Sequence, residues 1–166
     1  MRVLLLLSAA VCALSLALED ECAGCQAYDC FEDNVRCGAD SYLIKYGGKY
    51  CRKFNQPETL KKFSPAGQDF LHCTTSCLKV FMKDYISAKS YESPFSQSQC
   101  AALSSDAFGS HVKCYLDCNF CSICKTEKAA LFSIYEFRDF LSWNAVKQIY
   151  QVMRACGGPH TCFDLF

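Results

Sequence analysis

Four cysteines lie close together in the stretch KCYLDCNFCSICK, which spans residues 113–125. They are Cys114, Cys118, Cys121 and Cys124. Side chains three and four residues apart lie on the same face of a helix, so a helical segment would carry these four sulfurs as one stripe. Other segments must then come to the stripe to form disulfides with it. The alternative is a metal site, because the spacing C-x3-C-x2-C-x2-C resembles zinc or iron–sulfur ligation.

The N-terminus decides between these alternatives, because it indicates the compartment. The apolar run Val3–Leu18 has about the length of the apolar core of a signal peptide and is shorter than a membrane span. Small residues at 15–17 predict a signal peptide of residues 1–17. An uncleaved anchor is the alternative, and polar residues within so short a run argue against it. We therefore expect residues 18–166 to form a single secreted, extracellular domain.

Cleavage would remove Cys12 and leave fourteen of the fifteen cysteines. Thiols oxidise outside the cell, so this even number predicts seven disulfides and argues against the metal site. Each bridge across a long loop contributes roughly 2–4 kcal/mol, mainly by restricting the unfolded chain. The pairing stays open at this point. The expected disulfide cysteines are Cys22, Cys25, Cys30, Cys37, Cys51, Cys73, Cys77, Cys100, Cys114, Cys118, Cys121, Cys124, Cys156 and Cys162.

The charges of the chain are balanced, with seventeen basic and seventeen acidic residues. Nucleic-acid binding needs a basic face, so no nucleic-acid partner is expected. The same balance argues against electrostatic binding to anionic membranes. After the leader no run of apolar residues is long enough to span a bilayer, so no membrane insertion is expected.

Two strong helical patterns occupy the middle of the chain. Ser64-Pro65 is typical of a helix N-terminus, and it predicts a helix over residues 65–86. Ser96 and Gln99 have the form of a capping box, which predicts a further helix that runs through Phe108 and ends at Gly109-Ser110. The residues expected on the buried face of the first helix, at spacings of three and four, are Phe70, Cys73, Cys77, Phe81 and Tyr85.

Helical patterns also flank this region. A helix is expected from Tyr42 to Phe54, and Gly47-Gly48 within it means that either a packing contact needs a small residue or the segment breaks there. Ser142 is expected to cap a last helix, which Gly157-Gly158 ends. The apolar face of that helix is marked by Trp143, Val146, Tyr150, Met153 and Cys156. No strand-like alternation of useful length occurs, so we expect an all-α fold, a disulfide-stapled helical bundle.

No group of residues makes a convincing catalytic, cofactor-binding or metal site. His72 adjoins Cys73, but adjacent helical residues point in different directions and a disulfide cysteine is not a nucleophile. His111 and His160 are expected to be surface histidines in loops. The acidic clusters at residues 19–21 and 29–33 lack the spacing of a calcium-binding EF-hand loop, and we expect them to be solvated surface. The sequence therefore favours a protein without enzymatic activity or cofactor.

Three motifs resemble the stanniocalcin family. CQAYDCFEDNVRC (residues 25–37) is similar to the family's C-x4-C stretch followed by a further cysteine, and FSPAGQDFLHCTTSC (63–77) to its F-x-x-x-G-x-x-F stretch closed by a cysteine. Residues 114–125 match its pattern C-Y-x-x-x-N-x-C-S-I-x-K. Cys51, Cys100 and Cys156 fall between and after these blocks in the family's order. The resemblance covers most of residues 22–156.

The resemblance implies a secreted, helical hormone or regulatory factor that binds another protein and acts in calcium or phosphate homeostasis. Its expected partner is an extracellular receptor or protease. The chain has no N-x-S/T glycosylation sequon, unlike vertebrate members. Relative to the family pattern it adds Cys73, Cys118 and Cys124, which with Cys162 make an even number. We therefore expect a monomer or a non-covalent dimer. The alternatives are a secreted cysteine-rich effector, or a structural or host-interaction protein without hormone activity, and a secreted hydrolase.

Overall fold

The computed structural model describes residues 22–136, 139 and 142–162. Within these residues every regular element is a helix, which confirms the predicted all-α, disulfide-stapled bundle. The expected signal peptide lies outside the described residues, as does the tail after Cys162. The elements are η1 (Gly24–Gln26), α2 (Ala27–Val35), η2 (Leu43–Gly48), α3 (Lys49–Phe54), α4 (Pro57–Leu60), α5 (Pro65–Ala88), η3 (Ser90–Glu92), α6 (Gln97–Asp117), α7 (Phe120–Ile123), α8 (Lys128–Ile134), α9 (Trp143–Ala155) and α10 (Pro159–Cys162).

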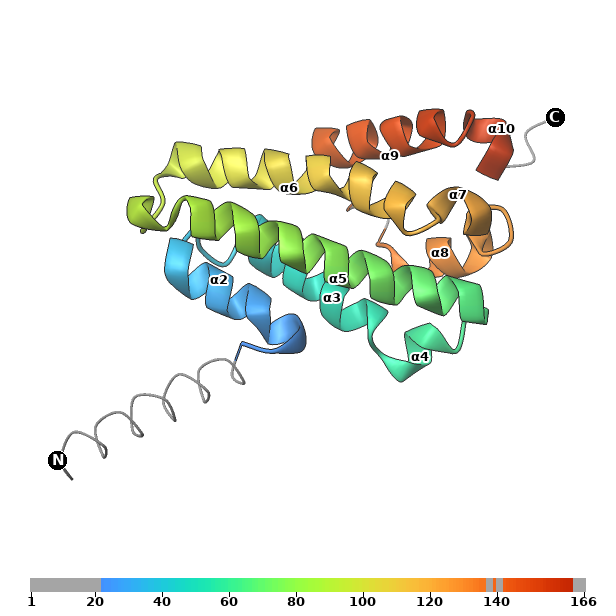
Figure 1. Cartoon of the computed structure of the whole chain (residues 1–166), viewed down its shortest axis with the longest axis horizontal. Coiled ribbons are helices and arrows are strands. Elements are labelled where there is room, and N and C mark those ends of the chain that lie inside the picture. The colour runs from blue at the N-terminus through green and yellow to red at the C-terminus, as the bar shows by residue number, and fades with distance from the viewer. Residues whose placement is uncertain (1–21, 137–138, 140–141, 163–166) are drawn as a thin grey trace, which may run out of the picture.

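Two long helices, α5 and α6, lie side by side at the centre of the molecule (Figure 1). They run antiparallel, because Cys73 pairs with Cys118 while Cys77, one turn further along α5, pairs with Cys114. α9 packs on α6, whereas α2 and α3 pack on α5. The N-terminal and C-terminal helices therefore cover different sides of the central pair.

Aromatic rings fill the space between these helices. Phe70 of α5 is only 2% exposed, and its ring centre lies 5.5 Å from that of Tyr115 in α6 and 5.6 Å from that of Phe120 in α7. Rings at these separations add an electrostatic attraction between ring edges and faces to the burial of large apolar surfaces. The aromatic residues thus join α5, α6 and α7 into one core.

α5 begins where the sequence predicts and ends two residues later than expected. The Ser64 hydroxyl accepts a hydrogen bond from the Gly67 N–H at 3.3 Å, and Pro65 occupies the first helical position. The predicted buried face is partly wrong: Cys73 is exposed, and Cys77, Phe81 and Tyr85 are only partly buried. α5 packs on α6 along one side and on α2 and α3 along another, so its buried face lies between the two and the cysteines lie at the edge next to α6. The buried residues are Gly67, Phe70, Leu71, Thr74, Leu78, Met82 and Ile86.

α6 has the predicted capping box but not the predicted end. The Ser96 hydroxyl accepts from the Gln99 N–H at 3.4 Å, and the Gln99 side chain accepts from the Ser96 N–H at 2.6 Å. The helix then continues through Gly109-Ser110 to Asp117. A single glycine costs a helix only about 1 kcal/mol. Burial of α6 against α5 on one side and α9 on another outweighs that cost.

The four cysteines of the cysteine-rich stretch lie in two groups that face different segments, and not along the single predicted stripe. Asn119 adopts a left-handed conformation (φ 65°), which ends α6 and turns the chain into α7. Asparagine tolerates this conformation better than most residues. Cys114 and Cys118 therefore face α5, whereas Cys121 and Cys124 pair with cysteines at the C-terminal end of the chain.

The Gly47-Gly48 segment does not break, because the helix passes through it as a single π-helical turn, η2, and continues as α3. Gly47 is buried, and a Cβ placed on it would overlap the ring of Tyr28. Tyr28 is only 1% exposed. Of the two sequence-based alternatives, the structure therefore shows a packing contact that needs the small residue.

We expect Gly47→Ala to lower the free energy of unfolding by about 1–3 kcal/mol, because the added methyl group overpacks the buried contact with Tyr28. Gly109→Ala is the matched control. A Cβ on Gly109 would meet no atom within 4 Å, so alanine should raise the free energy of unfolding by up to about 1 kcal/mol through its higher helix propensity. Urea unfolding of both variants measures these changes, and effects of equal sign would contradict the packing role of Gly47.

Candidate binding surface

The fourteen cysteines of the described residues form seven disulfides within the chain. Four of these cysteines belong to the cysteine-rich stretch, and each of the four pairs with a cysteine from another segment, as the sequence predicts. The pairs are Cys22–Cys30, Cys25–Cys51, Cys37–Cys100, Cys73–Cys118, Cys77–Cys114, Cys121–Cys156 and Cys124–Cys162.

Two of these bridges hold the C-terminal helices in place. Cys121–Cys156 joins α7 to the residue after α9, and Cys124–Cys162 joins the end of α7 to α10. At the other end of α9, the Ser142 hydroxyl accepts from the Ala145 N–H at 3.1 Å, so the predicted cap is present. Val152, between these points, is 1% exposed. α9 is therefore fixed in orientation, and one definite face of it points to solvent.

The solvent side of α9 is rich in large apolar residues. Six large apolar side chains are exposed in the described part of the chain, and three of them belong to this one helix. Trp143 is 79% exposed, Tyr150 is 64% exposed and Val146 is 45% exposed. Their offsets of three, four and seven residues place them on one face. Contiguous exposed apolar residues of this kind mark interaction sites.

The same face of α9 is basic. Lys147 and Arg154 lie four and eleven residues after Trp143, which places them beside it, and both are exposed. The sequence of α9 contains no aspartate or glutamate. We call this surface the α9 outer face; it consists of Trp143, Val146, Lys147, Tyr150 and Arg154.

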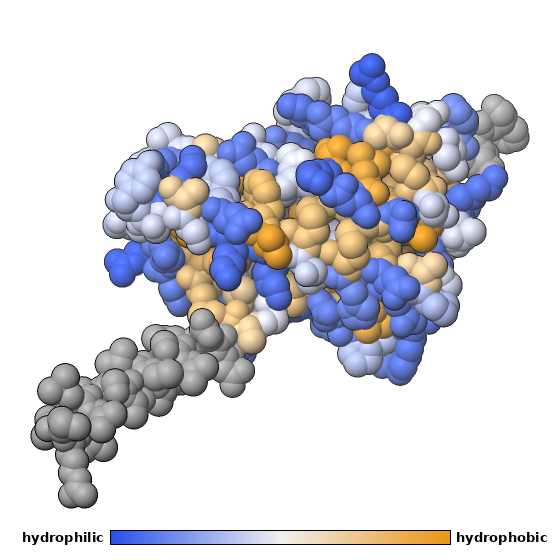
Figure 2. All heavy atoms as spheres, viewed as in Figure 1, coloured by the Kyte–Doolittle hydropathy of each residue, from blue (hydrophilic) through white to orange (hydrophobic). Residues whose placement is uncertain are grey.

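A broad groove adjoins the α9 outer face. It has a volume of about 1130 Å³ and is lined by α5, α6 and α9. Phe81, Val112 and Leu116 contribute apolar lining, and Lys147 belongs both to the groove and to the α9 outer face. Figure 2 shows apolar residues gathered in a band over the central helices, with hydrophilic residues along its borders. The exposed apolar surface therefore extends beyond a single helix.

The sequence-based interpretation grouped Trp143, Val146, Tyr150, Met153 and Cys156 on one apolar face of α9, and the structure divides this set: Met153 is partly buried and Cys156 is buried. Trp143, Val146 and Tyr150 point to solvent, whereas Ala145, Gln148 and Val152 are buried against the bundle. Both sets of residues recur at helical spacing, so periodicity alone cannot distinguish them. Gln148 is the one polar residue of the buried set, and its polarity alone would have predicted that this side of α9 faces solvent.

The expectation that His111 is a surface histidine in a loop is wrong. This residue lies within α6 and not in a loop, and its Nε2 atom lies 2.6 Å from the Tyr42 hydroxyl. Burial lowers the pKa of His111 to about 4, so the imidazole is neutral at physiological pH and shares one hydrogen bond with the tyrosine. His72 and His160 are exposed, the first beside Cys73 in α5 and the second in α10.

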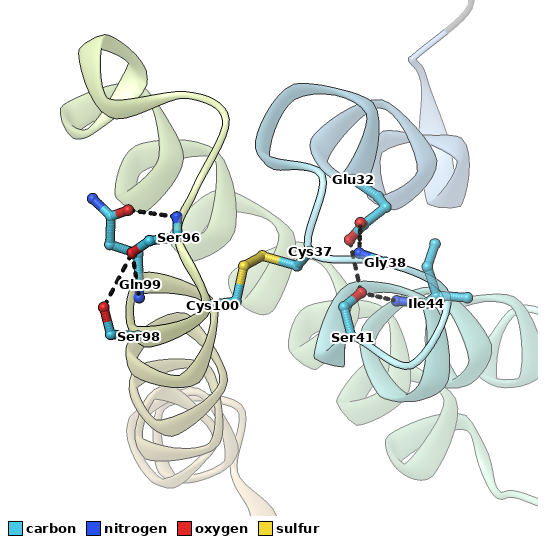
Figure 3. Close-up of a disulfide and its surroundings, with 9 residues drawn as sticks. All are labelled: Glu32, Cys37, Gly38, Ser41, Ile44, Ser96, Ser98, Gln99 and Cys100. Carbon is cyan, nitrogen blue, oxygen red and sulfur yellow. Dashed lines mark hydrogen bonds between the residues drawn. A yellow bond between two sulfur atoms is a disulfide. The ribbon is translucent and has the colours of Figure 1, made fainter.

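The acidic residues near the N-terminus have structural partners. Glu32 accepts hydrogen bonds from the Gly38 N–H and from the Ser41 hydroxyl, the latter at 2.7 Å (Figure 3). Asp29 pairs with Arg52 of α3. The other acidic cluster, residues 19–21, lies outside the described residues. Across the described ranges, no group of three or more His, Cys, Asp or Glu side chains is arranged to hold a metal ion.

No protein-family model, curated protein sequence or solved structure matches this chain. None of the helices in the described ranges is both long enough and apolar enough to cross a bilayer. Seven disulfides are nevertheless typical of an extracellular protein. The function must therefore be inferred from the surface itself and from the sequence motifs.

Proposed function

We propose that this chain is a secreted regulatory factor of stanniocalcin type, which acts by binding another extracellular protein through the α9 outer face. The observation that carries the proposal is the exposure of Trp143, Val146 and Tyr150 on a helix that two disulfides hold in place. Tryptophan, tyrosine and arginine are the residue types that most often dominate binding energy at protein interfaces. Three ordered sequence motifs similar to that family support the hormone or regulatory role.

Binding, and not catalysis, is the activity that the side chains favour. The described cysteines are oxidised. Cys73, which adjoins His72, has its sulfur bonded to that of Cys118. His111 is engaged with Tyr42. Nucleophilic catalysis by a Cys–His pair needs a free thiolate and an imidazole that can accept its proton. Cys73 is in a disulfide and His111 is hydrogen-bonded to Tyr42.

The charge of the α9 outer face indicates the kind of protein it binds. Lys147 and Arg154 provide two positive charges, and α9 has no carboxylate to neutralise them. A partner with an acidic patch, on a receptor or a protease, would be attracted and oriented by these charges, and its association would slow at high salt. Regulation of calcium or phosphate balance is the physiological role that the resemblance implies for such a complex.

The test is affinity capture of extracellular proteins on the immobilised, oxidised chain, followed by binding measurements on each captured protein. We expect the double variant Trp143→Ala/Tyr150→Ala to lower the affinity for the true partner at least tenfold, because both residues are candidate hot spots. Tyr91→Ala is the matched control, since Tyr91 is 82% exposed but lies on η3, away from α9. Lys147→Glu/Arg154→Glu should slow association most strongly at low salt.

Three outcomes would overturn this function. The captured proteins could bind the Trp143→Ala/Tyr150→Ala and Tyr91→Ala variants equally well. The α9 outer face could bind anionic lipid vesicles and no protein, since aromatic and basic residues on one helix face also suit a membrane interface. The purified protein could turn over a substrate.

A further inference from the structure

The core contains a cavity that the proposed function does not use. Its volume is about 160 Å³, and residues from the Tyr42–Phe54 region, α6, α8 and α9 line it. Ten of the twenty-four residues that line it are tyrosine or phenylalanine, among them Tyr42, Tyr46, Phe54, Tyr115 and Phe120. An apolar cavity of about 150 Å³ stays dry and is large enough to bind benzene. This cavity therefore has the size and the surface to hold one aromatic ring.

Hydrogen-bonding groups lie at one part of the wall. The Tyr42 hydroxyl and the His111 Nε2 atom are 2.6 Å apart, and both residues line the cavity. When neutral His111 accepts at Nε2, its Nδ1 atom carries the proton and remains a donor. In that tautomer the Tyr42 hydroxyl donates its only proton to Nε2 and keeps lone pairs that can accept. In the other tautomer Nε2–H donates to Tyr42, whose proton remains to donate, and Nδ1 is the acceptor. A ligand with one hydroxyl or N–H group would find both a donor and an acceptor in this region.

Charged groups of the wall are already engaged. Asp139 lies 2.7 Å from the Lys49 ammonium group and accepts a hydrogen bond from Tyr50. Lys128 also has an interaction partner. An ionic ligand would therefore have to be desolvated without gaining an unpaired opposite charge, which is costly in an apolar site. The cavity favours an uncharged ligand.

Some of the residues that line the cavity are also exposed at the surface. The exposure of its lining residues rises from 1% at Tyr28 and 5% at Tyr42 to 58% at Phe132, and Leu131 and Met153 are partly buried.

We propose that this cavity is a binding site for a small uncharged aromatic molecule between phenol and indole in size. The ring lies against the tyrosine and phenylalanine rings, where edge-to-face contacts contribute beyond the burial of area. The hydroxyl or N–H group of the ligand bonds to the Tyr42–His111 pair. The site is independent of the α9 outer face, because Trp143 and Tyr150 do not line the cavity.

Calorimetric titration and ligand-observed NMR of the full, oxidised chain with phenol, indole, toluene and benzoate test the proposal. We expect saturable binding of phenol and indole at one site per chain. Toluene lacks the hydrogen-bonding group and should bind more weakly than phenol. Benzoate is charged and should bind at least tenfold more weakly. Failure of phenol and indole to saturate the protein, or equal affinity for benzoate, would overturn the proposal.

Substitutions locate the ligand. Ala145 is 7% exposed and lines the cavity, so Ala145→Leu should fill it and weaken phenol binding at least tenfold. Leu131→Trp blocks the cavity from a partly exposed position and decides the outcome if Ala145→Leu does not fold. Tyr42→Phe should weaken phenol binding, because it removes one partner of the hydrogen-bonding pair. Val80→Trp, at a residue 52% exposed and outside the cavity, is the control. Unchanged phenol binding in Leu131→Trp would show that the ligand lies elsewhere.

Discussion

Replacement of both Cys37 and Cys100 by serine is expected to lower the free energy of unfolding by about 4 kcal/mol. This disulfide closes the longest loop of the seven, with a sequence separation of 63 residues. A bridge stabilises mainly by reducing the conformational entropy of the unfolded chain, and the effect grows with the logarithm of the loop length. The Cys22–Cys30 bridge closes a separation of only 8 residues, and its removal should cost about 2.5 kcal/mol by the same relation.

The folded state should survive the loss of the Cys37–Cys100 bridge, because hydrogen bonds hold the same two segments together. The Phe95 N–H donates to the Val35 carbonyl oxygen at 2.9 Å, and the Ser93 hydroxyl donates to the Asn34 side chain at 2.6 Å. On either side of the bridge, Glu32 binds the 38–41 turn and Ser96 caps α6 (Figure 3). The loss is therefore expected to arise in the unfolded chain and not from a distorted native structure.

Urea unfolding of Cys37→Ser/Cys100→Ser and of Cys22→Ser/Cys30→Ser measures both losses against the native chain. Near-ultraviolet circular dichroism before unfolding reports whether the aromatic core is retained. Equal losses, or a larger loss for the short loop, would show that native packing around the bridges and not loop closure sets their contribution.

Features that depend on neighbouring residues were predictable from the sequence. The Ser64 and Ser142 caps and the capping box of Ser96 with Gln99 all occur as expected. Each of them joins atoms only three residues apart, so the local sequence contains all the groups involved. The helical class and the oxidised cysteines follow from the same kind of local and compositional information.

Features that depend on distant segments were not predictable in this way. The pairing of Cys37 with Cys100, and of Cys121 with Cys156, is decided by which helices pack together. His111 bonds to Tyr42, which lies 69 residues away in the sequence. The direction in which Trp143 points depends on how α9 meets α6, because the helix has apolar residues on both sides. The exposure of the α9 outer face could therefore not be predicted from the sequence.

The burial of His111 predicts that the protein loses stability as the pH falls below about 6.5. Burial lowers the pKa of this imidazole from 6.5 to about 4 in the folded chain. Between these values the unfolded chain binds a proton that the folded chain does not, so acid favours unfolding. The stabilisation is complete above pH 6.5, and about 2 kcal/mol of it should be lost at pH 5. Urea unfolding at pH 8 and pH 5 measures the difference.

Carboxylates also titrate near pH 5, so the contribution of His111 must be separated by substitution. His111→Gln keeps an acceptor for the Tyr42 hydroxyl but does not titrate, and its stability should fall by about 2 kcal/mol less than that of the native chain. His72→Gln is the matched control, because His72 is exposed in the folded chain as it is in the unfolded one. It should lose as much stability in acid as the native protein. If the His111→Gln and His72→Gln variants responded alike, proton uptake at His111 would not be the cause of the acid sensitivity.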